Sequence, residues 1–278
     1  MNIVAADLHI HSRYSDGTDS AGDIAGLAME AGIRTLSLTD HDTVGGFVDF
    51  ERGCLDRGIM PVSGVEISTS QNNASIHILG YGITKSRELD SLLLLSAERR
   101  TENTRLVLDA LNRMNILDYK WADVERHAHG KSWISSSFIY ECMLKDGVFA
   151  DWSEWPGFYL EYFSRQSPAF INIGGIYPAD AIKAIRDSGG IPVLAHPGLM
   201  GSDEMIDHMV DEGLLGIEVF YPGHTAIDVE RYRSYVSGRG LLATGGSDYH
   251  GKASIYKNGI GDSGLDENML EKFLEALL

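Results

Sequence analysis

The segment Ile3-Val4-Ala5-Ala6-Asp7-Leu8-His9-Ile10-His11 near the start of the chain has the alternating pattern of a β-strand. Leu8 and Ile10 fall on one face of such a strand, and the two histidines fall on the other. Because both imidazoles point the same way, His9 and His11 can bind one metal ion. The segment therefore predicts a strand that carries a pair of metal ligands at its end.

Six further apolar segments have the length of strands, and helical patterns lie between them. The strands are predicted at residues 35–39, 60–67, 76–81, 191–195, 216–220 and 241–244. Ser20 can cap a helix that stops near Gly32, and Pro178 suits the first turn of a helix that ends near Gly189. Residues 266–278 indicate a terminal helix. This alternation predicts an α/β fold, in which open sheets and barrels alike place their chemistry at the carboxyl ends of the strands.

The middle of the chain departs from this alternation. Residues 88–114 have the pattern of one long amphipathic helix, and the stretch to about residue 168 is helical or irregular. We interpret its four tryptophans as core residues in preference to stacking platforms for a nucleobase: Trp121, Trp133, Trp152 and Trp155. We therefore predict an α/β domain in two parts, residues 1–87 and 169–278, with an inserted helical cap at 88–168.

The composition limits the partners and the compartment. A formal net charge of −17 argues against long nucleic acid, which is bound by clusters of Lys and Arg, and suits a small anionic substrate held by bound cations. We expect no membrane span and no signal peptide. Cys54 and Cys142 are too few for a disulfide framework, and we predict buried, reduced thiols in a cytoplasmic protein.

Histidines and carboxylates recur at or just beyond the ends of the predicted strands. Glu66 can bridge two metal ions with its two oxygens. Asp248 can complete the coordination of the ion that His9 and His11 bind. Two or three cations about 3.5–4 Å apart would polarise a phosphoryl group and supply hydroxide near neutral pH. No cysteine is available, so Mn²⁺, Fe²⁺ and Zn²⁺ are favoured. The predicted ligands are His9, His11, Asp16, His41, Glu66, His77, His196, Asp248 and His250.

These motifs resemble the PHP (polymerase and histidinol phosphatase) family, and within it the stand-alone metal-dependent phosphoesterases with a helical insert. The resemblance covers roughly residues 1–85 and 170–270. The motifs that carry it are His9-Ile10-His11, Ser15-Asp16-Gly17, Leu38-Thr39-Asp40-His41-Asp42, Gly64-Val65-Glu66, His77, Leu194-Ala195-His196-Pro197 and Gly246-Ser247-Asp248-Tyr249-His250.

The resemblance implies a distorted (β/α)7 barrel with a dinuclear or trinuclear metal site. It also implies hydrolysis of phosphate esters such as AMP, nucleoside 3',5'-bisphosphates or the 5' ends of short RNA. In the insert, where such relatives usually carry an Arg-Pro-His-like run, this chain reads Gly130-Lys131-Ser132-Trp133-Ile134-Ser135. This departure bears on the identity of the substrate and leaves the metal chemistry unaffected.

Further residues are candidates for the reaction itself. The attacking hydroxide is expected near Asp248 and Glu66. His224, at the end of the sixth predicted strand, is a candidate to contact the phosphate or to protonate the leaving group. Arg13 and Lys131 are candidates to neutralise the substrate phosphate.

Some of the acidic residues have a second interpretation. Asp16 lies in an Asp-Gly pair, which is also a strong turn signal. Asp7, Asp40 and Asp42 are candidates to accept a hydrogen bond that orients a ligating imidazole.

Two other functions share the predicted metal ligands. A histidinol-phosphate phosphatase would differ only in the pocket for its leaving alcohol. A binding module could sense nucleotides through bound metal without turnover. A purely structural metal site needs only about four ligands, fewer than are predicted here.

Overall fold

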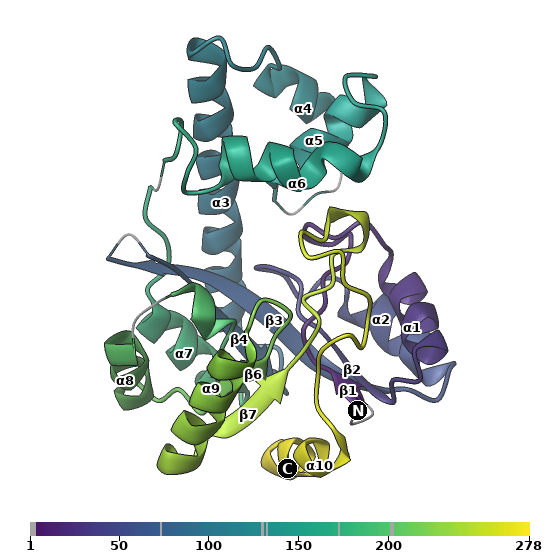
Figure 1. The fold of residues 1–278 in the computed structure, drawn as a ribbon, viewed down its shortest axis with the longest axis vertical. Helices are drawn as coiled ribbons and strands as arrows, with labels where there is room; N and C mark the ends of the chain where they lie inside the picture. Colours follow the sequence, from purple (N-terminus) through teal and green to yellow (C-terminus); the bar gives the residue numbers. More distant parts are fainter. Residues whose placement is uncertain (1–3, 73, 129–130, 132, 172, 201–202) are drawn as a thin grey trace.

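The computed structural model describes residues 4–72, 74–128, 131, 133–171, 173–200 and 203–278 (Figure 1). Gly130 and Ser132 of the departing motif, and Ile3 of the first predicted strand, lie outside this part. Seven strands form one sheet in the order of the sequence. They are β1 (Ala6–Asp7), β2 (Thr35–Leu38), β3 (Met60–Gln71), β4 (Ala74–Tyr81), β5 (Ile191–Leu194), β6 (Gly216–Phe220) and β7 (Leu242–Gly245).

The sheet closes on itself at its two edges. The Leu8 N–H donates to the Gly245 carbonyl at 3.2 Å, and Ile10 forms a parallel bridge with Tyr249. These contacts join the chain after β1 to the chain after β7. The predicted distorted seven-stranded barrel is therefore confirmed.

The direction of β4 corrects one expectation. Helices were predicted between all strands, but β3 and β4 form a hairpin in which Gln71 pairs with Ala74. The strand β4 is antiparallel to both β3 and β5, whereas the other neighbouring strands are parallel. The amino end of β4 therefore lies at the same rim as the carboxyl ends of its neighbours. This direction places His77, near the start of β4, at that rim.

Helices surround the barrel (Figure 1). As predicted, Ser20 caps the first helix, because its side chain accepts from the Asp23 N–H. The terminal helix packs on the barrel interior, where the rings of Phe273 and Tyr81 meet at 5.3 Å. These helices are α1 (Ala21–Glu30), α2 (Phe47–Leu55), α7 (Pro178–Asp187), α8 (Asp203–Asp211), α9 (Ala226–Arg239) and α10 (Glu267–Ala276).

A helical segment, residues 87–163, lies at the opposite end of the barrel from α10 (Figure 1). Its long helix α3 (Arg87–Arg113) matches the predicted span. The amino-terminal half of α3 packs against β3 and α7. The segment continues through α4 (Trp121–His127), α5 (Ser136–Lys145), α6 (Trp155–Phe158) and a π-helix, η2 (Tyr159–Phe163). These elements share an apolar cluster that includes Trp155 and Phe138. The boundaries predicted for the inserted helical cap, residues 88–168, stay a prediction.

Both cysteines are buried free thiols, as predicted. Cys54 lies in α2 and Cys142 lies in α5. Within the described residues, no helix is both long enough and apolar enough to cross a membrane.

Candidate metal centre

Four of the predicted ligands meet at the barrel rim, at the floor of the site. The His11 Nε2 lies 3.1 Å from Glu66 Oε2 and 3.2 Å from Asp248 Oδ1. The His9 Nε2 lies 3.2 Å from the same glutamate oxygen. One ligand atom from each of these four residues falls within 4.8 Å of the others. We call this set the first ligand group.

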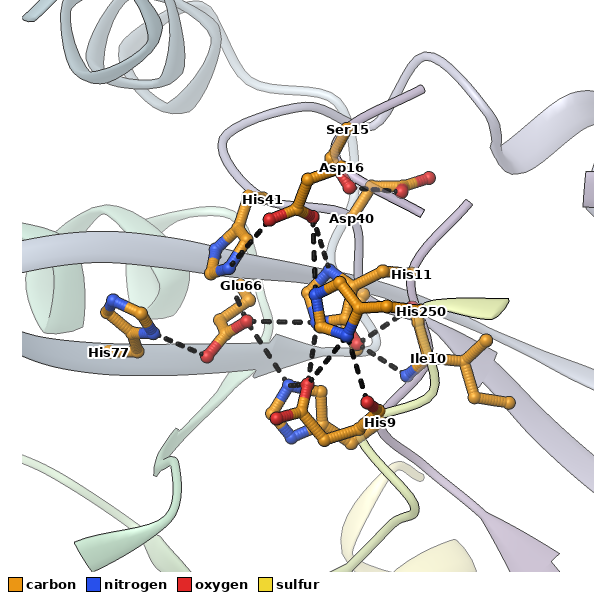
Figure 2. Close-up of polar contacts among 12 residues, drawn as sticks. His9, Ile10, His11, Ser15, Asp16, Asp40, His41, Glu66, His77 and His250 are labelled. Atoms are coloured by element: carbon orange, nitrogen blue, oxygen red, sulfur yellow. Dashed lines mark hydrogen bonds and ion pairs between the residues drawn. The ribbon is translucent and has the colours of Figure 1, made fainter. Parts of the chain in front are cut away.

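A second ligand group uses the other side of Glu66. The His77 Nδ1 and the His196 Nε2 lie 2.9 and 3.0 Å from Glu66 Oε1, and the His41 Nδ1 lies 3.2 Å from Oε2. Figure 2 shows Glu66 between His77 on one side and His11 on the other, with His41 above it. Glu66 thus lies between the two groups, and its role as a bridging ligand stays a prediction.

A third ligand group lies above the first. It combines His11, Asp16, His41 and His250, whose ligand atoms lie within 4.8 Å of one another. The Asp16 Oδ1 lies 3.3 Å from His250 Nε2, and the rings of His11 and His250 stack at 4.0 Å (Figure 2). The structure therefore brings all nine predicted ligands into three groups that share members.

The unsatisfied atoms in these groups fit a site built for cations. Among the described residues, His9 Nε2, both ring nitrogens of His11 and Asp16 Oδ1 are buried without a hydrogen-bond partner. Buried polar atoms are normally hydrogen-bonded, and an exception in a native fold calls for an explanation such as an ion. Imidazole and carboxylate donors at one rim provide that explanation.

The charges of the centre balance one another. Burial disfavours the charged forms of all these groups. At His11, nevertheless, the carboxylates of Asp248 and Glu66 outweigh burial and raise the pKa to about 10. At Glu66, burial is outweighed in turn, because the imidazoles of His41, His9 and His77 hold the pKa of this carboxyl well below its usual range. Burial lowers the pKa of His41 and His77, whereas the carboxylates raise that of His9, His11 and His196. Without metal, protons on the last three imidazoles therefore offset part of the charge of the carboxylates.

The backbone at two strand ends is unusual. His196 and Asp248 have φ values of 30° and 52°, in the left-handed region that non-glycine residues rarely adopt. His196 lies two residues beyond the end of β5, and Asp248 lies three residues beyond the end of β7. The His196 ring contacts Glu66, and the Asp248 carboxylate contacts His9 and His11. Gly246 precedes the turn at Asp248, and a Cβ on Gly246 would collide with the backbone of His9. Such backbone conformations are concentrated at functional sites.

Glu218, in β6, is a buried residue of the centre that the sequence analysis missed. It accepts from His9 Nδ1 at 2.9 Å and from the His196 N–H at 2.8 Å. Both contacts fix the orientation of a predicted ligand. The available signal was an acidic residue in the middle of an apolar strand.

Asp7, Asp40 and Asp42, which were predicted to orient imidazoles, make other contacts. Asp40 accepts from the hydroxyls of Ser12 and Ser15, both at 2.6 Å, and Asp7 accepts from the Ser247 N–H at 2.9 Å. Asp42 accepts from the Ser68 N–H. These carboxylates tie the loops of the rim together, and the expectation that each orients an imidazole is corrected accordingly.

A cavity of about 560 Å³ opens over the centre. Its walls come from the barrel rim, from α3 and from residues 133–175. Arg100 of α3 lines it, with its guanidinium 4.1 Å from the centre of the Trp133 ring and 3.8 Å from Asp42 Oδ2. Arg99 and Arg165 line it as well. The sequence analysis did not single out these arginines, although the pair Arg99-Arg100 lies in the middle of the predicted long helix.

The three residues proposed from the sequence for the substrate lie elsewhere. Arg13 donates to the Thr18 carbonyl, and Lys131 donates to the Arg13 carbonyl at 3.0 Å; neither lines the cavity. His224 is engaged at both ring nitrogens, with the Val219 carbonyl at 3.0 Å and the Gly198 N–H at 3.1 Å. A residue held in this way has no free nitrogen with which to protonate a leaving group. Instead it supports the turn that follows His196.

Comparison with known proteins agrees with this architecture. The PHP domain model matches residues 7–148, about half of the chain. The chain belongs to the PHP domain family. A phosphoribosyl 1,2-cyclic phosphate 1,2-diphosphodiesterase of Eggerthella lenta is 33% identical over 88% of this chain and 94% of its own length. A 3',5'-nucleoside bisphosphate phosphatase of Chromobacterium violaceum is 29% identical over 88% of this chain and 86% of its own.

A solved structure from Bifidobacterium adolescentis, assigned as a metal-dependent phosphoesterase, matches this PHP chain with a TM-score of 0.86. The two share 27% identity, and the match covers 97% of this chain and 95% of the other. This PHP protein is therefore a metal-dependent hydrolase of phosphate esters.

Proposed function

We propose that this phosphoesterase acts on small phosphorylated ribose compounds, first among them nucleoside 3',5'-bisphosphates, and then AMP or the 5' ends of short RNA. The observation that carries the proposal is the position of the three ligand groups at the floor of a cavity with arginines in its wall. A volume of about 560 Å³ suits a ligand the size of one nucleotide. The names of the two relatives above each describe a pentose that carries two phosphate groups.

The nine ligands listed above would hold two or three divalent cations, with Mn²⁺, Fe²⁺ and Zn²⁺ as the candidates. Such ions supply Lewis-acid stabilisation of the phosphoryl group and a nucleophile at neutral pH. Glu66 and Asp248 hold negative charge at the floor, which draws the cations there. The Tyr221 hydroxyl donates to Asp248 Oδ2 at 3.2 Å and orients this carboxylate.

Arg100 would bind the substrate phosphate that is not cleaved. Its side chain is 27% exposed and lines the cavity, while Asp42, Ser68 and Trp133 hold it in place. A guanidinium restrained in this way is well suited to recognise a phosphate. The net charge of −17 makes long nucleic acid an unfavourable partner.

The test of the proposal is phosphate release from a panel of esters. The panel contains adenosine 3',5'-bisphosphate, AMP, phosphoribosyl 1,2-cyclic phosphate, a short 5'-phosphorylated RNA and histidinol phosphate. We expect turnover of adenosine 3',5'-bisphosphate and AMP, and loss of this turnover when a chelator removes the metal ions. Preference for histidinol phosphate, which no observation in the structure favours, would refute the substrate assignment.

Asp248→Asn separates an enzyme from a sensing module. The substitution removes a charge that holds the cations, and several kcal/mol of transition-state stabilisation corresponds to a loss of roughly 100-fold or more in kcat/KM. If nucleotides bind to the wild-type protein but are not hydrolysed under any metal condition, the sensing module is the better assignment.

Arg100→Met tests the substrate contact. Loss of a charge-assisted hydrogen bond of about 1.5–3 kcal/mol lowers kcat/KM for the bisphosphate about 10- to 100-fold. The effect on AMP is expected to be smaller, since AMP has no second phosphate. Arg105→Met is the matched control, because Arg105 lies on the same helix and pairs only with Asp109 among the ion pairs of the described residues. An equal loss for both substrates would contradict the contact.

A further inference from the structure

Four side chains of the helical segment make hydrogen bonds to backbone carbonyls of the barrel rim. Lys131 donates to Arg13 at 3.0 Å, and the Ser137 hydroxyl donates to Asp16 at 3.1 Å. The Trp133 indole N–H donates to His41 at 3.2 Å, and that of Trp155 donates to Ala253 at 2.7 Å. These contacts connect the segment to the loops that follow β1, β2 and β7.

The same three loops supply all members of the third ligand group. His11 and Asp16 follow β1, His41 follows β2 and His250 follows β7. Two of the carbonyl acceptors belong to ligand residues themselves, Asp16 and His41. The third loop is a short turn in which the His250 N–H donates to the Ser254 hydroxyl at 2.8 Å, with Ala253 inside it.

The residues that the other two ligand groups do not share with the third depend less on this segment. Glu66 and His77 are residues of β3 and β4, and the ladder between these strands fixes their backbones. His196 lies two residues beyond the end of β5 and is held through its N–H by Glu218. The helix α3 does contact β3, but it does so through Ser96 and Arg100 and therefore from a different part of the segment.

The donors that hold the third group are shielded from water. Trp133 and Trp155 are each 3% exposed, and Ser137 is 6% exposed. Ala253 is itself a member of the apolar cluster of the helical segment. Water is therefore poorly placed to replace a donor that is lost, and the carbonyl would remain unsatisfied.

We propose that Ser137, Trp133 and Trp155 are positioning residues that hold the third ligand group in shape for a third cation. In this arrangement the helical segment builds one metal position as well as covering the cavity. Without these donors the loops of Asp16, His41 and His250 relax, while the members that the first two groups do not share with the third, such as Glu66, His77 and His196, keep their geometry. The inference rests on the proposed function only in assigning cations to the ligand groups.

The test counts Mn²⁺ ions on the chelator-stripped full chain, with free Mn²⁺ measured by electron paramagnetic resonance during titration. The variants are Ser137→Ala, Trp133→Phe and Trp155→Phe, which remove a donor and keep most of the side chain. Outer contacts of metal sites contribute about 10- to 100-fold to affinity. We expect the third equivalent of Mn²⁺ to bind more weakly by this factor, and the first two equivalents to change much less, because their groups keep ligands that lie outside the three loops.

Trp121→Phe is the matched control. It removes an indole N–H whose partner, Glu125, lies within the helical segment. A merely stabilising role of the segment would lower the melting temperature in all four variants without a selective change in the third equivalent. If a tryptophan variant fails to fold, Ser137→Ala still decides the question, because it deletes only a hydroxyl.

The outcomes separate this inference from the proposed function. Three Mn²⁺ bound with equal affinity in the wild type and in Ser137→Ala would overturn the positioning role, and so would a wild type that binds only two. A selective loss of the third ion supports the role even if the wild type hydrolyses none of the phosphate esters in the panel. In that case the substrate assignment alone fails.

Discussion

At the scale of single residues, the pKa of His11 links metal uptake to protons. The imidazole must be neutral to bind a metal, yet Asp248 and Glu66 raise its pKa to about 10 after opposing its burial. Metal binding near pH 7 must therefore displace protons, and affinity falls as the pH is lowered. Calorimetric titration with Mn²⁺ in buffers of different ionisation enthalpy measures this release. An observed enthalpy that is independent of the buffer would contradict it.

The same shift has a consequence for the metal-free protein, with the opposite dependence on pH. A raised pKa means that the folded state binds the proton more tightly than the unfolded state does. For His11 this contribution to the free energy of unfolding is complete below pH 6.5 and is lost as the pH rises to about 10. Urea unfolding of chelated protein at pH 6 and pH 9 measures the decrease. Greater stability at pH 9 would contradict it.

Glu218→Gln tests the residue that sequence reasoning missed. The amide keeps the shape of the side chain but removes the charge that faces His9 Nδ1. Residues that hydrogen-bond to metal ligands contribute about 10- to 100-fold to metal affinity. We therefore expect the first equivalent of Mn²⁺ to bind more weakly by this factor. Glu230→Gln, on the exposed surface of α9, is the control. Unchanged metal affinity would reduce Glu218 to a structural role.

At the scale of elements, the two thiols report whether the helical segment opens on its own. Burial raises the pKa of both Cys54 and Cys142 to about 12, so neither reacts appreciably with a disulfide reagent at pH 8 while folded. If the segment is an independent cap, Cys142 in α5 becomes reactive at lower urea concentration than Cys54 in α2. Reaction of both thiols at one urea concentration would show a single cooperative unit.

The strand β4 shows where pattern alone misleads at this scale. Its position, near residues 76–81, was predicted correctly, but its direction depends on the hairpin with β3. Periodicity reports which residues are buried and does not report which way a strand runs. The antiparallel direction is what brings His77 to the rim.

At the scale of the whole molecule, the ligands are contributed by distant parts of the chain. Glu66 contacts His9, His41, His77 and His196. His9 belongs to the first half of the barrel and His196 to the second, so the centre joins both halves. Cations bound there would connect these halves and stabilise the folded state. At a metal concentration about 100 times Kd the gain is about 2.7 kcal/mol, or roughly 5–10 °C in melting temperature. Differential scanning calorimetry with Mn²⁺ and with chelator measures it, and equal melting temperatures would contradict it.

The sequence by itself predicted six of the seven strands close to their observed bounds, the long helix and the nine residues that the structure brings together in the ligand groups. These follow from local patterns, because alternation and polar residues at strand ends are properties of adjacent residues. The first strand is shorter than predicted, since β1 covers only Ala6–Asp7 of residues 3–11. The tertiary structure decided the direction of β4, the closing contacts between β1 and β7, and the parts played by Glu218, Arg100 and His224. These depend on which side chains from distant segments become neighbours, and such neighbours leave no local pattern in the chain.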